Sequence, residues 1–97
     1  MTYSLHRAAE LDLLEAAKFY RHEGGAKLAN RFLDEFERVA KLLIEFPGIG
    51  TPAEDLRRIY RLHDFPYSVI YRETGGHIRV LVVRGHLRDP DYGESRR

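Results

Sequence analysis

The stretch Tyr67-Ser68-Val69-Ile70-Tyr71-Arg72 is followed by Thr74-Gly75-Gly76-His77 and then by Ile78-Arg79-Val80-Leu81-Val82-Val83. The first and last of these segments are rich in β-branched and aromatic residues, which is typical of β-strands. The Gly-Gly pair between them predicts a tight hairpin turn, because glycine accepts positive φ at both central positions. The strand at 78–83 is apolar on both faces. We therefore expect it to lie centrally in a sheet and to be covered, at least in part, on both sides.

Upstream of this hairpin the apolar residues recur with the period of a helix. A first helix is predicted from about residue 8, on the spacing of Ala9, Leu13, Ala16, Ala17 and Tyr20. Gly24-Gly25 ends it, since glycine suits the left-handed position after a helix. A second helix is predicted at about 26–45, with an apolar stripe made of Ala29, Phe32, Phe36, Val39, Ala40 and Leu43. Because very few residues join the two helices, they form an antiparallel hairpin.

Two shorter strands complete the predicted fold. The segment 3–5 reads as an edge or first strand, and 59–62 reads as a strand that follows a loop rich in proline and glycine at 47–52. The order is β-α-α-β-β-β, an α+β fold in which a helical hairpin packs on one face of a small, mainly antiparallel sheet. The 97 residues are expected to form one domain, of which 84–97 is a polar tail.

The second face of this sheet is not covered by the two helices. Two interpretations remain open for it. Either a partner protein covers the face, or the sheet is strongly twisted and its apolar groups are shielded by arginine and tyrosine side chains.

The composition is that of an ordinary globular protein, with 43% hydrophobic and 32% charged residues, which argues against disorder. There is no apolar run of about 18–20 residues and no secretory signal at the N-terminus, so no membrane association is expected and a cytoplasmic location is the default. The chain has no cysteine. Disulfides, thiolate metal sites and a cysteine nucleophile are therefore excluded.

The net charge of +1 conceals an asymmetry along the chain. Residues 1–56 carry 7 Lys and Arg against 10 acidic residues, whereas residues 57–97 carry 9 Arg, no Lys and 5 acidic residues. Arginine favours planar, bidentate contacts with carboxylates and phosphates. The excess is smaller than that of a dedicated nucleic-acid-binding protein.

Most standard catalytic motifs are absent. The sequence has no phosphate-binding glycine loop, no G-x-S-x-G nucleophile elbow and no H-E-x-x-H zinc motif. Its 5 histidines show no metal-ligand spacing. We therefore expect neither a metal nor a cofactor.

The polar tail holds the most informative polar residues, because it follows a buried strand directly. Arg84 and Arg88 are suited to hold a phosphate or a carboxylate, His86 to transfer protons, and Tyr92 to stack on a base or donate a proton. A purely structural interpretation is that Arg88 pairs with Asp89 or Asp91 while Tyr92 packs the tail onto the sheet.

Taken in order, these segments resemble the RelE/ParE superfamily of type II toxin–antitoxin toxins over about residues 3–92. The segment 9–16 resembles the first helix of the family, with its Ala-x-x-Asp-Leu core at 9–13. The segments 32–36 and 46–50 resemble the second helix of the family and the Pro-Gly pair that ends this helix. The strand at 65–72, the strand at 78–83 and the tail Arg88-Asp89-Pro90-Asp91-Tyr92 resemble the remainder of the family fold.

The resemblance implies a small bacterial toxin that forms a hetero-oligomer with a cognate antitoxin. The superfamily contains ParE-like members, which poison DNA gyrase, and RelE-like members, which cut mRNA on the ribosome. The RelE-like set implies His86 and Tyr92 as catalytic residues, with Arg84, Arg88 and Arg72 around the phosphate. For a gyrase poison, Arg84, His86, Arg88 and Tyr92 would instead form a target-binding surface.

Two departures from the RelE-like pattern favour the ParE-like branch. Ser68 stands where the strand arginine of the nucleases falls, and a net charge of +1 is low for a ribosome-dependent toxin. The tail departs from the ParE-like pattern as well, because Gly93 stands where an aromatic residue is frequent, which implies weaker packing. We therefore predict a ParE-like gyrase poison that is not an enzyme. The alternatives are a ribosome-dependent mRNA endoribonuclease and an inactive homologue that only binds the antitoxin.

Overall fold

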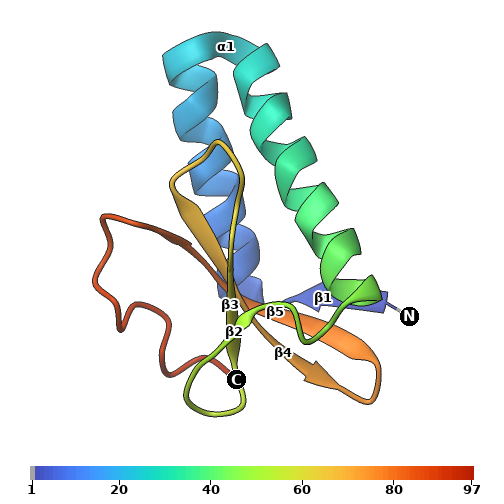
Figure 1. Cartoon of the computed structure of the whole chain (residues 1–97). Helices are drawn as coiled ribbons and strands as arrows, with labels where there is room; N and C mark the ends of the chain where they lie inside the picture. Colours follow the sequence, from blue (N-terminus) through green and yellow to red (C-terminus); the bar gives the residue numbers. More distant parts are fainter. Residues whose placement is uncertain (1) are drawn as a thin grey trace.

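The computed structural model describes residues 2–97, which form an α+β fold with one sheet and one long helical element (Figure 1). Its elements are β1 (Thr2–Leu5), α1 (Arg7–Glu45), β2 (Thr51–Pro52), β3 (Arg58–Arg61), β4 (Tyr67–Thr74) and β5 (His77–Gly85). The five strands lie in the order β1-β5-β4-β3-β2. Only β1 and β5 pair in parallel, so the mainly antiparallel sheet is confirmed.

The element α1 contains both predicted helices, because only one residue interrupts it. Gly25 has φ 80° and ψ −177°, a conformation that is almost exclusive to glycine. The chain reverses there, and the two helical arms run side by side, away from the sheet and back to it (Figure 1). The helical hairpin is therefore confirmed. The second arm ends at Glu45, just before Phe46 and Pro47, as predicted.

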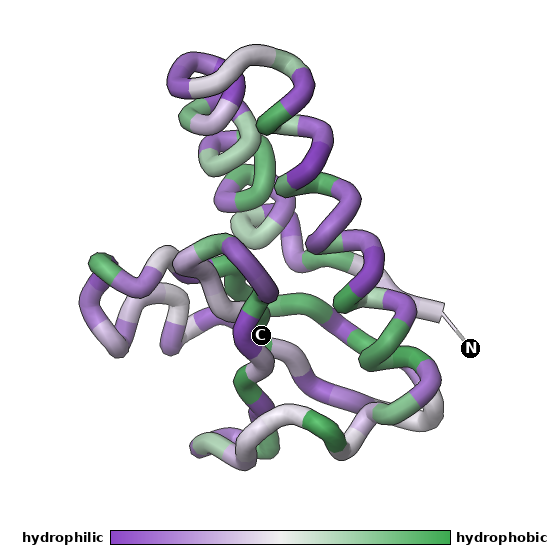
Figure 2. The backbone as a smooth tube through the Cα atoms, turned by 45° about the horizontal axis from the view of Figure 1, so that its top comes forward, coloured by the Kyte–Doolittle hydropathy of each residue, from purple (hydrophilic) through white to green (hydrophobic). Residues whose placement is uncertain are grey.

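The main core lies between the helical arms and the sheet. Apolar and polar residues alternate along both arms (Figure 2), and the predicted stripe of the second arm is buried throughout. The first arm contributes Ala9 and Ala16 to the same core, while Leu13, Ala17 and Tyr20 are partly buried against it. The sheet supplies Val69, Tyr71, Ile78, Val80 and Val83.

A β-bulge explains why β5 is apolar on both faces. The pairing of β4 and β5 shifts register between Ile70 and Tyr71, so that Leu81 is an extra residue on β5. Val80 and Val83 consequently face the helical arms, whereas Leu81 and Val82 join Ile70 in a second, smaller cluster on the other face.

The tail covers this second cluster. Tyr92 packs against it, and the Arg57 guanidinium donates hydrogen bonds to the carbonyls of Gly93 (3.2 Å) and Glu94 (2.7 Å). From β5 the tail loops out and returns to the sheet beside β2 and β3 (Figure 1). Shielding by the protein's own tyrosine and arginine therefore accounts for the middle of this face without a partner protein.

Three details differ from the predicted layout. The loop at 47–52 contains the two-residue edge strand β2. β4 and β5 are longer than predicted, and β5 runs from His77 into the expected tail as far as Gly85. The strand predicted at 59–62 lies at Arg58–Arg61.

Gly93 is a point of close packing, contrary to the weak packing that its departure from the family pattern implied. Its φ is 79°, and a Cβ placed there would lie 2.5 Å from Cγ2 of Val82. Only glycine lets the tail lie this close to the sheet.

We predict that Gly93→Ala lowers the free energy of unfolding by about 2–4 kcal/mol, because it adds a clash to the left-handed strain. Gly75→Ala is the matched control. Its φ is also positive, at 57°, but its Cβ would meet no atom within 4 Å. Urea denaturation of both variants measures the difference, and equal losses would show that the tail does not pack on Val82 as described.

Candidate functional site

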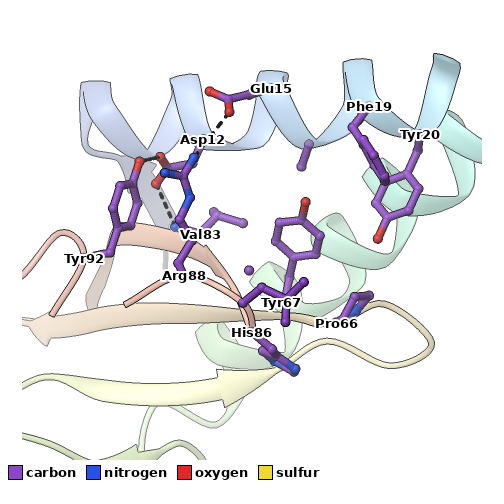
Figure 3. A pocket seen from close by; sticks show the side chains of 13 residues that line it. Asp12, Glu15, Phe19, Tyr20, Pro66, Tyr67, Val83, His86, Arg88 and Tyr92 are labelled. Atoms are coloured by element: carbon purple, nitrogen blue, oxygen red, sulfur yellow. Dashed lines mark hydrogen bonds and ion pairs between the residues drawn. The ribbon is translucent and has the colours of Figure 1, made fainter. Parts of the chain in front are cut away.

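A groove of about 690 Å³ opens between the first arm of α1 and the open end of the β4–β5 hairpin, where β4 begins and β5 ends (Figure 3). Its lining is mainly apolar and aromatic, and includes Ala16, Phe19, Tyr20, Pro66, Tyr67 and Leu87. The charged residues Asp12, Glu15 and Arg88 also line it, together with His86. It is thus an apolar groove that carries both signs of charge.

Aromatic rings fix the shape of this groove. Tyr20 packs on Phe65 and Tyr67 with ring centroids 5.1 and 6.1 Å apart, and Phe32 lies beneath these rings. Burial raises the pKa of the Tyr67 hydroxyl, and the nearby Glu15 carboxylate raises it further. Phe19 is 54% exposed and Leu87 fully exposed beside the groove. The groove therefore offers a preformed apolar surface that is suited to a partner's side chains.

Asp12 joins three parts of the fold at one end of the groove. β1 pairs with β5 as far as Val80. Further along β5, the Val83 N–H donates a hydrogen bond of 3.1 Å to the Asp12 carboxylate instead of to a strand. The carboxylate also accepts one from the Tyr92 hydroxyl at 2.6 Å and pairs with the Arg96 guanidinium at 2.6 Å. Arg96 donates in turn to the Leu81 carbonyl at 3.1 Å. The Asp12 side chain, which is only 7% exposed, thus ties α1, β5 and the tail together.

Tyr92 has a structural place in this cluster. The pKa of its hydroxyl is raised, first because it donates a hydrogen bond to the Asp12 carboxylate and second because it is partly buried. Two guanidinium groups also contact its ring, with the Cζ atoms of Arg88 and Arg96 at 4.6 and 4.9 Å from the ring centroid. Such a tyrosine holds its proton tightly and packs the tail onto the sheet.

Arg88 forms an ion pair different from the ones predicted for it. Its guanidinium lies 3.3 Å from the Glu15 carboxylate on α1, rather than pairing with Asp89 or Asp91. Both side chains of the pair are at least half exposed, so its contribution to stability is small. The pair is therefore available for exchange with a partner's charges.

The other predicted site residues are dispersed. The Nε2 atom of His86 lies 3.1 Å from the Ser68 hydroxyl, and Ser68 pairs in register with Arg84. Arg84 donates to the Pro90 carbonyl at 2.6 Å and lines a smaller pocket with Tyr92. Arg72 lies further along β4, opposite Arg79, and donates to the Asp55 carbonyl at 3.1 Å. The structure thus brings His86 and Arg88 to one groove, with Tyr92 beside them, but not Arg84 and Arg72.

Sequence reasoning did not assign a role to Asp12, Arg96 or Arg57. Asp12 lies within the Ala-x-x-Asp-Leu core at 9–13, and its place in that family motif is the one sequence signal that marks it. Its partners Tyr92 and Arg96 are 80 and 84 residues away along the chain. A contact between residues so far apart in the sequence leaves no periodic pattern from which it could be predicted.

Two further properties of residues 2–97 bear on function. No three histidine, aspartate or glutamate side chains of this part of the chain are gathered so that they could hold a metal ion. Likewise, α1 is not apolar enough to span a membrane.

Comparison with known proteins gives concordant matches. The family model described as the ParE toxin of the type II toxin–antitoxin system parDE matches residues 3–90. Toxin ParE1 of Caulobacter vibrioides is 29% identical over 82 residues, which cover 84% of this chain and 83% of that protein. A solved structure titled the chromosomal ParDE TA system from P. aeruginosa superposes with a TM-score of 0.76 and 25% identity, covering 88% of this chain and 95% of that one.

We predict that Asp12→Ala lowers the free energy of unfolding by about 3–5 kcal/mol, because it leaves the Arg96 guanidinium, whose side chain is only 13% exposed, without a counter-charge. Tyr92→Phe removes one hydrogen bond of the same cluster and is expected to cost about 1–2 kcal/mol. Glu15→Ala, on the same helical arm, is the control and should cost less than about 0.5 kcal/mol. Chemical denaturation measures all three. A loss for Asp12→Ala as small as that of the control would contradict the role of Asp12.

Proposed function

The chain belongs to the ParE toxin family of type II toxin–antitoxin systems, and from this premise we propose that it inhibits bacterial growth by poisoning DNA gyrase and is neutralised by a cognate antitoxin. It acts in the cytoplasm by binding rather than by catalysis. Arg84, His86, Arg88 and Tyr92 are the proposed target-binding residues.

The arrangement of Tyr92 is the observation that carries this proposal. Cleavage of RNA needs an acid, a base and several cations around one phosphate. Here the tyrosine hydroxyl donates to Asp12 and has a raised pKa, while Arg72 and Arg84 contact backbone carbonyls elsewhere. This dispersion favours a binding surface over the ribonuclease alternative.

The groove is the proposed site of the antitoxin. Its apolar lining provides the contact area that a partner segment would bury, and the exposed Glu15–Arg88 pair offers both charges to that segment. Because His86 and Arg88 line the same groove, an antitoxin segment lying there would cover part of the target-binding surface. Neutralisation then follows from occlusion.

The target is tested by expressing the protein in bacteria without antitoxin and following thymidine and methionine incorporation side by side. We expect thymidine incorporation to fall first, because a gyrase poison stops DNA synthesis before translation. The variant His86→Gln should still inhibit growth, since His86 is only one of four proposed binding residues and no step of a binding mechanism requires it to transfer a proton.

Other outcomes of that experiment identify the alternatives. An early fall in methionine incorporation that His86→Gln abolishes would establish the ribosome-dependent endoribonuclease in place of the gyrase poison. Absence of growth inhibition by the wild type would indicate an inactive homologue that only binds the antitoxin.

The antitoxin site is tested with two exposed phenylalanines of similar accessibility. Phe19, beside the groove, is 54% exposed, and Phe46, at the far end of the helical element, is 53% exposed. Phe19→Glu should weaken binding of the co-expressed antitoxin by at least about tenfold, because it places a charge on an apolar contact. Phe46→Glu should leave that affinity unchanged in isothermal titration calorimetry. Equal effects of the two substitutions would rule out the groove.

A further inference from the structure

The turn between β2 and β3 has an unusual backbone. The Arg57 N–H donates to the Glu54 carbonyl at 3.1 Å, which closes a four-residue β-turn. Its two central residues, Asp55 and Leu56, have φ angles of 58° and 61°. Positive φ at both central positions is the pattern of a type I′ turn, in which asparagine and glycine are preferred. Leucine is a costly choice at the second central position, because its Cβ crowds the backbone in the left-handed region.

Within residues 2–97, packing does little to offset this cost at Leu56. Its side chain is 87% exposed and belongs to neither apolar cluster. The residue therefore destabilises the fold twice, by its backbone conformation and by presenting an apolar side chain to water. Backbone strain of this kind, where no packing repays it, is a starting point for a functional hypothesis.

The rest of the fold holds this turn in place. The Ala53 N–H donates to the Arg57 carbonyl at 2.8 Å, and Nε of Arg72 on β4 donates to the Asp55 carbonyl at 3.1 Å. Arg57 is itself buried and fixed by its hydrogen bonds to the tail. Leu56 is thus displayed on a rigid support. Because the backbone of the turn is already ordered, binding through Leu56 does not have to order the loop, which favours affinity.

The surroundings of the turn indicate the character of its partner. The guanidinium of Arg97 is 66% exposed, and the nearest carboxylate oxygen, on Asp55, is 3.9 Å away. Asp55 itself is 55% exposed, so the turn presents one accessible positive charge and one accessible negative charge beside Leu56. The turn also adjoins β2, the edge strand opposite β1, whereas the groove lies along α1 and β5.

We propose that Leu56 is an anchor that inserts into an apolar socket on the toxin's protein target, with a carboxylate of that target beside Arg97. The inference rests on the proposed function and takes DNA gyrase as that target. It adds a second contact, at the opposite edge of the sheet from the one formed by His86 and Arg88. The two contacts together would fix the orientation of the toxin on a large partner.

The test separates binding from folding, because Leu56→Gly has opposite effects on the two. Glycine adopts positive φ without strain, so the melting temperature should stay the same or rise, although the greater freedom of glycine in the unfolded chain limits the gain. Affinity for purified gyrase, measured by surface plasmon resonance, should fall by at least about tenfold. Leu56→Met, which keeps an apolar side chain, should retain most of the affinity.

Leu11→Ala is the control, because it removes another exposed apolar side chain on the outer side of α1, and it should bind gyrase as the wild type does. Unchanged affinity of Leu56→Gly would overturn the inference while leaving the proposed function intact. A loss of affinity accompanied by a lower melting temperature would also overturn it, since Leu56 would then stabilise the fold. If the wild type itself does not bind gyrase, the proposed function fails and this inference fails with it.

Discussion

A single buried carboxylate determines how the helical element, the central strand and the tail are placed. β5 extends past the end of β1, and the edge that it leaves there needs hydrogen-bond partners. Asp12 and Arg96 supply an acceptor for the Val83 N–H and a donor for the Leu81 carbonyl, and they neutralise each other's charge. Tyr92 completes the cluster from the tail. Asp12 and Tyr92 also line the groove, so the cluster ties α1 to β5 at one end of it.

The same cluster gives Tyr92 a structural role, whereas the RelE-like sequence pattern implies a catalytic role for it. A hydroxyl that donates to a carboxylate at 2.6 Å is occupied in the folded protein. The arginines that would accompany it around a phosphate instead support loops and turns, as Arg84 does for Pro90 and Arg72 does for Asp55. What remains accessible is an apolar groove with an exposed ion pair, Glu15–Arg88, at its rim, and such surfaces are suited to recognising proteins.

The sequence predicts the elements that local patterns define. The helical arms follow from an apolar period of about 3.6, the β4–β5 hairpin from Gly75-Gly76, and both are found. β2 was missed because two residues, one of them proline, carry no strand pattern. The parallel pairing of β1 with β5 and the bond between Asp12 and Tyr92 depend on residues more than 70 positions apart. The left-handed turn at Leu56 could not be foreseen, since leucine disfavours that conformation.

The contacts between the two ends of the chain have a consequence for its synthesis. β1 is the first element to leave the ribosome, yet it pairs with β5, and Asp12 finds its counter-ion only at Arg96. Long-range closure of this kind is slow and cannot begin before the later residues exist. The Asp12–Arg96 pair therefore cannot form until residue 96 has been synthesised and has left the ribosome. Any partner that recognises the finished surface competes for it from that moment, and not earlier.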